Sequence, residues 1–261
     1  MCGTGRDTLI PPRETWRVRH NIEKILALLG EYSQKATFFI LGSVAERDPV
    51  LAPMISSAGH EIASHGYSHR LVTDLTSQQF RDELIRTEQL LIEQTGQSPI
   101  GYRAPQWSLS EQTGWPFAIL KERGYCYDSS LNPLPFVGNA HGCRSVYRRA
   151  GEGEGLLEFP PLVTRSRLGN LPTGGGWGFR FFPMRMICGG IDEINRCGHP
   201  AVLFLHPRDV DPDGPRLELP FLKRFASYGT RSDATPRLNE LLQRYRFTTF
   251  KELVNEWQSV S

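Results

Sequence analysis

The chain has 261 residues and a formal net charge of +2, with acidic and basic residues interspersed along it. This length supports one sizeable core, and the charge pattern lacks the basic stripe that would indicate nucleic acid or an anionic membrane as a partner. Five cysteines without a Cys-x-x-Cys spacing favour free thiols over a disulfide framework or a thiolate zinc site. We expect one domain over residues 1–261, with an irregular segment over residues 1–20.

Helical and strand patterns alternate in the first part of the chain. Apolar residues recur at helical spacing over 21–29, and a β-prone apolar run follows over 36–41. Asp48 and Pro49 predict the start of a second helix, with Asp as the N-cap and Pro at the first helical position. A strand is expected after this helix, over 60–64.

The alternation continues through the rest of the chain. Thr76 and Gln79 predict a capping box for a long amphipathic helix, which Gly96 ends. The other expected elements are helices over 111–123 and 184–196 and strands over 100–103, 125–129, 156–159 and 201–205. Repeated helix–strand units predict parallel strands covered by helices, because a parallel connection needs a crossover. A barrel and a doubly wound sheet both satisfy this pattern.

Polar residues stand at the ends of four expected strands: His65, Arg103, Asp128 and His206. Because parallel strands end at a common edge, these side chains are expected to gather where barrels of this class place their active sites. Each residue alone also has a structural interpretation, as an ion-pair partner, a turn cap or a satisfied imidazole. The four together favour a functional site.

His65 and His69 lie four residues apart directly after the strand expected over 60–64. One turn of chain can direct both imidazoles at a single metal ion, and catalytic zinc sites take three protein ligands of this kind. The pair supplies two of the three. Two surface histidines that share this spacing by chance are the alternative interpretation.

Five short motifs lie between residues 36 and 207, within a resemblance that runs over about residues 21–250. They are Ala36–Gly42 (ATFFILG), Gly59–His69 (GHEIASHGYSH), Gly101–Pro105 (GYRAP), Tyr127–Ser130 (YDSS) and Leu205–Pro207 (LHP). In this order they resemble the polysaccharide deacetylase family, the NodB-homology domain of carbohydrate esterase family 4. The glycine-rich segment 171–176 and the run 206–212 are similar to those of the branch found in exopolysaccharide loci. The resemblance implies an α/β fold, a distorted (β/α) barrel with about seven strands.

The resemblance also implies an activity, the metal-dependent hydrolysis of N-acetyl groups from hexosamines of a polysaccharide. His65 and His69 would bind a divalent metal together with one carboxylate, zinc being the first choice and cobalt or nickel compatible with the same ligands. Arg103 would orient the carboxylate that acts as base, and Asp128 would tune a neighbouring charged group. His206 would donate the proton that the leaving amine needs.

Three further residues are candidates for contact with an N-acetylated polysaccharide or oligosaccharide. Trp107 and Trp177 could stack on the apolar faces of sugars, although core packing is the default role of an aromatic side chain. Gly175 lies in a run of glycines that would let the backbone approach a sugar closely. Asp209 and Asp211 are interpreted as loop acids or caps.

The beginning of the chain departs from the family pattern. The family opens with a strand that ends in two acidic residues, one the catalytic base and one the third metal ligand, and neither Asp7 nor Glu14 follows an apolar strand. A misplaced or truncated start explains this, so the first barrel strand is expected to be missing or replaced. A glycan-binding pseudoenzyme is the competing interpretation, and a metal-dependent hydrolase of a small amide or imide is the third.

The sequence as given also predicts a location. No apolar run approaches the roughly 20 residues that span a bilayer, and the first residues lack the apolar part of a signal peptide. We therefore expect a cytoplasmic chain without a membrane span.

Overall fold

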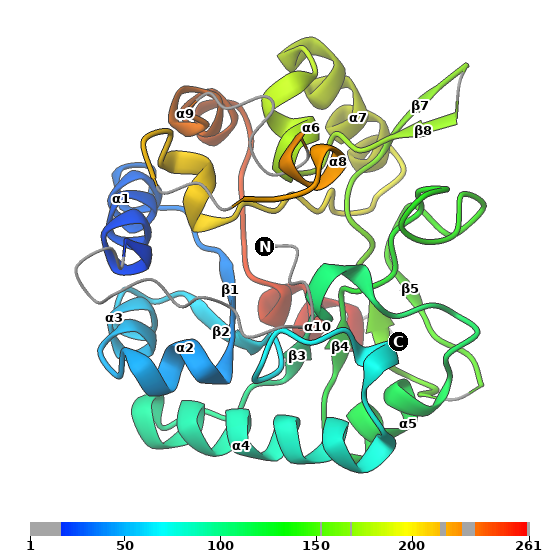
Figure 1. Cartoon of the computed structure of the whole chain (residues 1–261). Coiled ribbons are helices and arrows are strands. Elements are labelled where there is room, and N and C mark those ends of the chain that lie inside the picture. The colour runs from blue at the N-terminus through cyan, green and yellow to red at the C-terminus, as the bar shows by residue number, and fades with distance from the viewer. Residues whose placement is uncertain (1–16, 152, 168, 215–217, 226–232, 260–261) are drawn as a thin grey trace. The chain divides into compact units, whose positions relative to one another are not determined.

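The computed structural model describes residues 17–151, 153–167, 169–214, 218–225 and 233–259 (Figure 1). The chain divides into two compact units. The sheet unit comprises the described parts of Lys35–Pro160 and Phe247–Ser261, and the helix unit comprises those of Met1–Gln34 and Pro161–Arg246. None of the described helices is both long enough and apolar enough to cross a membrane.

The sheet unit is built around six strands in the order β1-β2-β3-β4-β6-β5. They are β1 (Thr37–Ile40), β2 (Glu61–Ser64), β3 (Gly101–Tyr102), β4 (Tyr127–Asp128), β5 (Tyr147–Arg148) and β6 (Leu157–Glu158). β1, β2, β3, β4 and β6 pair in parallel, and β5 pairs with β6 in the antiparallel sense. The predicted α/β fold with a parallel sheet is therefore confirmed, with each expected strand shorter than its sequence pattern.

Helices connect the parallel strands of this unit. They are α2 (Gly42–Arg47), α3 (Leu51–Ser57), α4 (Ser77–Thr95) and α5 (Trp115–Glu122), with the short 3-10 turns η2 (Val72–Asp74) and η3 (Pro105–Trp107) between them. Figure 1 shows α4 alongside α2, α3 and α5. The predicted capping box of α4 is confirmed, since Thr76 accepts from the amide of Gln79 and Gln79 accepts from that of Thr76. Gly96 ends α4 in the left-handed conformation, at a φ of 70°.

The core of the sheet unit lies between α4, α5 and the strands. Phe80 and Leu84 from α4 pack with Tyr102 from β3 and with Phe117 and Leu120 from α5. Each side chain of this size that leaves water contributes about 1.5–3 kcal/mol. This packing fixes α4 against the sheet, so side chains on the turns beyond the strand ends have a rigid base.

The last helix of the chain, α10 (Phe250–Ser259), belongs to the sheet unit. The Phe250 ring lies 5.9 Å from Phe39, 5.2 Å from Tyr127 and 4.6 Å from Phe159. Its backbone amide also donates to Thr37 Oγ1 at 2.9 Å. Phe39 and Phe250, which lie near opposite ends of the sequence of this unit, are thereby joined in one aromatic cluster.

The helix expected to start at Asp48 starts instead at Leu51, so this prediction is wrong. The Asp48 amide donates to Val44 O at 2.9 Å and makes Asp48 the C-cap of α2, a helix that the sequence pattern does not indicate. Pro49 has no N–H with which to continue α2. The local N-cap signal of Asp48 is overridden because the residues before it are already helical.

The helix unit contains α1 (Val18–Glu31), α6 (Gly176–Phe181), α7 (Met184–Arg196), η4 (Pro207–Val210), α8 (Phe221–Arg224), α9 (Thr235–Arg244) and the hairpin of β7 (Thr164–Ser166) and β8 (Gly169–Leu171). The helix predicted over 184–196 is confirmed as α7. Residues 18–20 form the first turn of α1 and are not irregular as the sequence suggests.

The strand predicted over 201–205 is wrong as an element of a sheet. Phe204 makes a single isolated parallel bridge to Gly175, and the Val202 carbonyl accepts from the Leu162 amide at 2.8 Å. The segment is extended, but its neighbours are loop residues that do not continue the ladder on either side.

Candidate functional site

The two histidines lie on a turn that follows the end of β2. The His65 amide donates to Ile40 O at 3.0 Å, which extends the β1–β2 ladder by one bond and fixes His65 at the carboxyl edge of the sheet. Gly66 and His69 adopt left-handed φ values of 73° and 64° and fold the chain back. As a result the His65 and His69 rings lie 5.4 Å apart, edge to face.

The hydrogen-bond partner of His65 shows which of its ring nitrogens carries the proton. His65 Nδ1 lies 2.6 Å from the carbonyl oxygen of Arg103, which only accepts, so Nδ1 carries the proton. Nε2 is then the nitrogen with the lone pair, as in metal sites where a carbonyl orients a histidine ligand. The pair therefore fits a divalent metal that accepts imidazole nitrogen.

The described residues contain no group of three or more His, Cys, Asp or Glu side chains that could hold a metal. The donor set found among them is the pair His65 and His69. Asp7 and Glu14, the acids weighed as candidates for the missing acidic motif, lie outside the described residues.

Arg103 follows β3 and is anchored on the loop after β4. Its Nε donates to Ser129 O at 3.0 Å and its Nη2 to Ser129 Oγ at 2.7 Å. The guanidinium carbon lies 4.3 Å from the centre of the Phe39 ring and 5.3 Å from that of Trp107. Burial lowers the pKa of Arg103 to about 10, so the side chain remains a cation at neutral pH. A cation held by aromatic faces is thus fixed beside the histidine turn.

Trp107 joins this group through a special backbone conformation. Gln106 and Trp107 both have left-handed φ values, 54° and 58°. For residues other than glycine such values cost about 1–2 kcal/mol each, and they cluster at functional sites. The structure thus brings His65, His69, Arg103 and Trp107 together at the carboxyl edge of the sheet.

Asp128 is directed into the core of the sheet unit. Its carboxylate is fully buried and accepts from the Ser130 amide at 2.9 Å and from Ser130 Oγ at 2.6 Å. Its register partner on β6 is Glu158, which is fully buried as well and accepts from the Leu131 amide at 2.9 Å. Asp128 therefore shapes the loop that carries Ser129, and its charge acts to raise the pKa of Arg103.

Asp128 and Glu158 form a buried pair of acids whose pKa values are both raised. Burial, followed by the charge of Asp128 and a hydrogen bond to it, raises the pKa of Glu158 well above its usual range. Burial also raises the pKa of Asp128. Glu158 Oε2 is buried without a hydrogen-bond partner, which favours the neutral form of this acid over the charged one.

We expect Glu158→Gln to gain stability over the natural chain as pH rises. The pKa of Glu158 is raised on folding, so its stabilising contribution is complete below about pH 4.5 and is lost as pH rises through the folded-state pKa. Glutamine imitates the protonated acid and does not titrate. Urea unfolding between about pH 5 and about pH 9 measures the difference, with the exposed Glu111→Gln as control. Parallel pH profiles for the natural chain and Glu158→Gln would contradict the raised pKa of Glu158.

His206 belongs to the helix unit, where it caps η4. Its amide donates to Asp209 Oδ2 at 2.8 Å, and its Nδ1 is buried and faces the same oxygen at 3.5 Å. The rest of the ring is open, since 41% of the side-chain surface is exposed. Burial lowers the pKa of His206 below its usual 6.5 and outweighs the opposite effect of Asp209. The imidazole is neutral at pH 7, oriented through Nδ1 and accessible at its other edge.

Asp209 is not the solvated loop acid that its sequence context suggests. Its side chain is fully buried and pairs with Arg180 Nη1 at 3.2 Å, and the Arg180 side chain is itself only 2% exposed. Burial acts to raise the pKa of Asp209, but His206 and Arg180 outweigh it and bring the pKa to about 2. Asp211 is likewise buried and bonds to Arg17 at 2.7 Å. Both acids are structural anchors.

Gly175 and Trp177 also belong to the helix unit. A Cβ at Gly175 would lie 2.4 Å from Phe204 O, so contact with the chain itself already requires glycine there. The centre of the Trp177 ring lies 6.1 Å from that of Phe181, 5.8 Å from that of Phe182 and 6.0 Å from that of Phe225. Phe181 and Phe225 are 56% and 42% exposed, so this aromatic group is open at the surface.

Sequence reasoning missed three supporting residues. Ser129, which holds Arg103, is part of the YDSS motif, but nothing in the sequence assigns its partner. Glu158 is an acid within an otherwise apolar strand pattern, and this is a usable signal for a buried polar contact. Glu83, which contacts the histidine turn, is one of several acids on a charged helix and gives no sequence signal.

Two family models match the chain. Residues 13–127 match the family described as Polysaccharide deacetylase, and residues 129–255 match one described as Domain of unknown function (DUF3473). A peptidoglycan deacetylase from Helicobacter pylori is 37% identical over 138 residues, which are 53% of this chain and 44% of that protein. The chain spans less than half the length of the curated relatives it matches.

Two solved structures share the fold over most of the chain. A putative polysaccharide deacetylase from Mycobacterium smegmatis has a TM-score of 0.66 at 22% identity, covering 92% of this chain and 77% of that one. Puue allantoinase has a TM-score of 0.64 at 18% identity, covering 92% and 72%. At these identities the likeness establishes the α/β architecture alone.

Proposed function

Because residues 13–127 match the polysaccharide deacetylase family, the NodB-homology group or carbohydrate esterase family 4, we propose that the chain hydrolyses N-acetyl groups on the hexosamines of a polysaccharide. The observation that supports this most strongly is the pair His65 and His69, whose rings lie 5.4 Å apart at the carboxyl edge of a parallel sheet. Nδ1 of His65 is hydrogen-bonded to the Arg103 carbonyl, which leaves Nε2 as the nitrogen that could bind a metal. The substrate class is an N-acetylated glycan, since the relatives that match are named peptidoglycan deacetylases.

His65 and His69 would hold a divalent metal, with zinc as the first candidate. When bound, such an ion polarises an amide carbonyl and lowers the pKa of a neighbouring water molecule. The Arg103 carbonyl keeps the His65 proton on Nδ1, so Nε2 remains available as a ligand at neutral pH.

Arg103 and His206 would carry out the other steps of the reaction. Arg103, whose guanidinium is oriented by Ser129 and whose carbonyl contacts His65, would orient a carboxylate base of the kind that the family pattern places after its first strand. Because His206 is neutral at pH 7, it would first take up a proton at its accessible edge and would then donate it to the leaving amine, while its Nδ1 edge faces Asp209. Trp107, Trp177 and the backbone at Gly175 would contact the sugar.

Acetate release from N-acetylglucosamine oligomers tests this function. With added zinc we expect release by the natural chain, and a decrease of about 10²- to 10⁴-fold in His206→Ala, because proton donation by a positioned side chain contributes that much. His20→Ala is the matched control, since His20 is an exposed residue of α1, with 60% of its side-chain surface accessible.

The same assay separates the alternatives. Binding of the oligomers without acetate release, in a zinc-loaded chain, would favour the glycan-binding pseudoenzyme. Hydrolysis of small amides or imides without any release from the oligomers would favour the third interpretation.

A further inference from the structure

The turn that carries both histidines is held by a carboxylate from α4, and we propose that this residue, Glu83, is a positioning residue for the metal site. The inference rests on the proposed function, because it concerns the conformation in which His65 and His69 bind a metal. Glu83 acts through Tyr67 and Ser68, two of the three residues between His65 and His69.

Glu83 accepts the hydrogen bonds that the turn has to donate. Its Oε2 accepts from the Tyr67 amide at 3.1 Å and from the Ser68 amide at 3.2 Å, and its Oε1 accepts from Ser68 Oγ at 2.5 Å. Bonds from backbone amides to a carboxylate are charge-assisted and about twice as strong as neutral ones. Two of the three backbone amides between His65 and His69 therefore have the same acceptor, while that of Gly66 donates to Ser64 Oγ at 3.3 Å.

The carbonyl groups of the turn are held from another element. Gly66 O accepts from the Gly42 amide at 2.9 Å, and Tyr67 O accepts from the Ser43 amide at 3.1 Å, both at the start of α2. A Cβ at Gly42 would lie 2.5 Å from Thr87 Oγ1 of α4 and 2.6 Å from the Tyr67 ring, so α2, α4 and the turn are closely packed. The turn is thus clamped by α4 through its amides and by α2 through its carbonyls.

This clamp explains how an unfavourable turn is maintained. Gly66 and His69 both have left-handed φ values, and at His69 this conformation costs about 1–2 kcal/mol. Without Glu83 the two amides lose their acceptor, and the chain between the ligands is free to relax. A supporting contact of this kind, one step removed from the metal, typically contributes about 10- to 100-fold to metal affinity.

The test measures zinc binding and local exchange in the full chain for Glu83→Gln and Glu83→Ala. We expect zinc affinity, from competition with a chelating dye, to fall by about 10- to 100-fold, with alanine the more severe. In the metal-free chain we expect the amide hydrogens of Tyr67 and Ser68 to exchange at least about 10-fold faster. Glutamine keeps one acceptor oxygen and a similar shape, so it tests the idea even if the alanine variant folds poorly.

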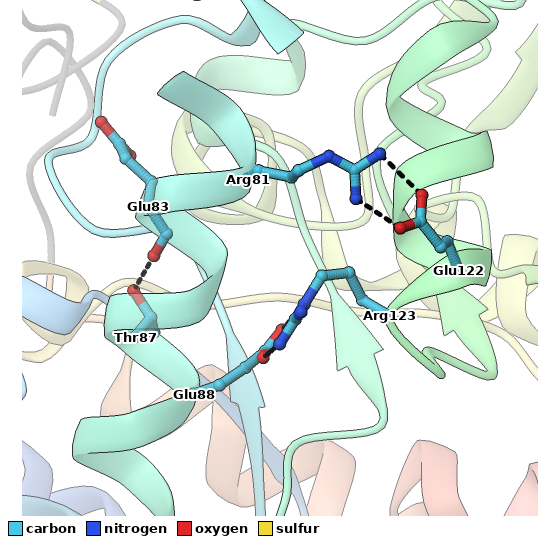
Figure 2. A network of polar contacts seen from close by, with 6 residues as sticks. All are labelled: Arg81, Glu83, Thr87, Glu88, Glu122 and Arg123. Atoms are coloured by element: carbon cyan, nitrogen blue, oxygen red, sulfur yellow. Dashed lines mark hydrogen bonds and ion pairs between the residues drawn. The ribbon is translucent and has the colours of Figure 1, made fainter. Parts of the chain in front are cut away.

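Glu88→Gln is the matched control on the same helix. Figure 2 shows Glu88 directed at Arg123, to which it is bonded, and Glu83 directed away from that pair. Loss of the Glu88–Arg123 pair lowers the melting temperature but leaves the acceptor of the histidine turn in place. We expect Glu88→Gln to retain the zinc affinity of the natural chain and its exchange rates at Tyr67 and Ser68.

Each outcome decides one of the two claims. Unchanged zinc affinity in Glu83→Ala, or unchanged exchange at Tyr67 and Ser68, overturns the inference. A natural chain that binds no zinc counts against the proposed function, and the exchange rates then still decide whether Glu83 holds the turn.

Discussion

Replacing His65 with alanine is expected to lower zinc affinity by at least about 100-fold and deacetylation by about 10³-fold or more, the latter corresponding to about 4 kcal/mol of transition-state stabilisation. His65 is one of the two imidazole donors at the carboxyl edge of the sheet, and its Nδ1 is bonded to Arg103 O. The substitution removes a ligand and a contact that joins the ends of β2 and β3.

Zinc binding and acetate release by the same preparation measure the two effects separately. His141→Ala is the control, because His141 is an exposed residue of the same unit. A His65→Ala chain with the zinc affinity of the natural chain would exclude the turn as the metal site. A chain that binds zinc less tightly but releases acetate at the natural rate would exclude the metal from the reaction.

Arg180→Ala is expected to destabilise the helix unit by about 3–5 kcal/mol, because it leaves a buried carboxylate without its cation. The Arg180 and Asp209 side chains are 2% and 0% exposed, and Nη1 lies 3.2 Å from Oδ1. The pKa of Asp209 is held near 2, so this stabilisation is present above about pH 4 and is lost as pH falls toward 2. Urea unfolding at neutral pH measures the loss.

Arg244→Ala is the matched control for this substitution. Arg244 pairs with Asp192 at 3.1 Å, but both side chains are about half exposed, at 51% and 42%. An exposed pair contributes about 0–1 kcal/mol, so the control is expected to unfold close to the natural chain. Equal losses in the two variants would show that burial does not strengthen the Arg180–Asp209 pair.

The elements that the sequence predicts well are those whose signals are local. α4 begins at Thr76 and ends at Gly96 because capping groups and a left-handed glycine lie within the segment itself. The prediction that a helix starts at Asp48 is wrong because Asp48 is the C-cap of α2. The local sequence around Asp48 does not show which of the two helices it belongs to. Phe204 makes only a bridge because a strand depends on partners supplied by distant residues.

The candidate site also combines features that local sequence predicts with features that depend on contacts to distant residues. The spacing of His65 and His69 alone indicates a pair of ligands, and in the structure the centres of their rings lie 5.4 Å apart. The burial of Asp128 depends on Glu158, which lies 30 residues later and becomes its neighbour only when β4 and β6 pair. The contact of Glu83 with the turn depends on how α4 packs, which no short motif encodes.

The clamp on the histidine turn binds peptide groups, whereas the Tyr67 side chain is held separately, by a hydrogen bond from its hydroxyl to Glu46 at 2.7 Å and by Arg86, whose guanidinium carbon lies 4.0 Å from the ring centre. Fluorotyrosine incorporated at this position keeps the backbone bonds to Glu83 and Ser43, because those bonds do not involve the ring. The label would stand between His65 and His69 in the sequence. A change in its fluorine resonance when zinc is added would therefore report metal binding without any substrate present.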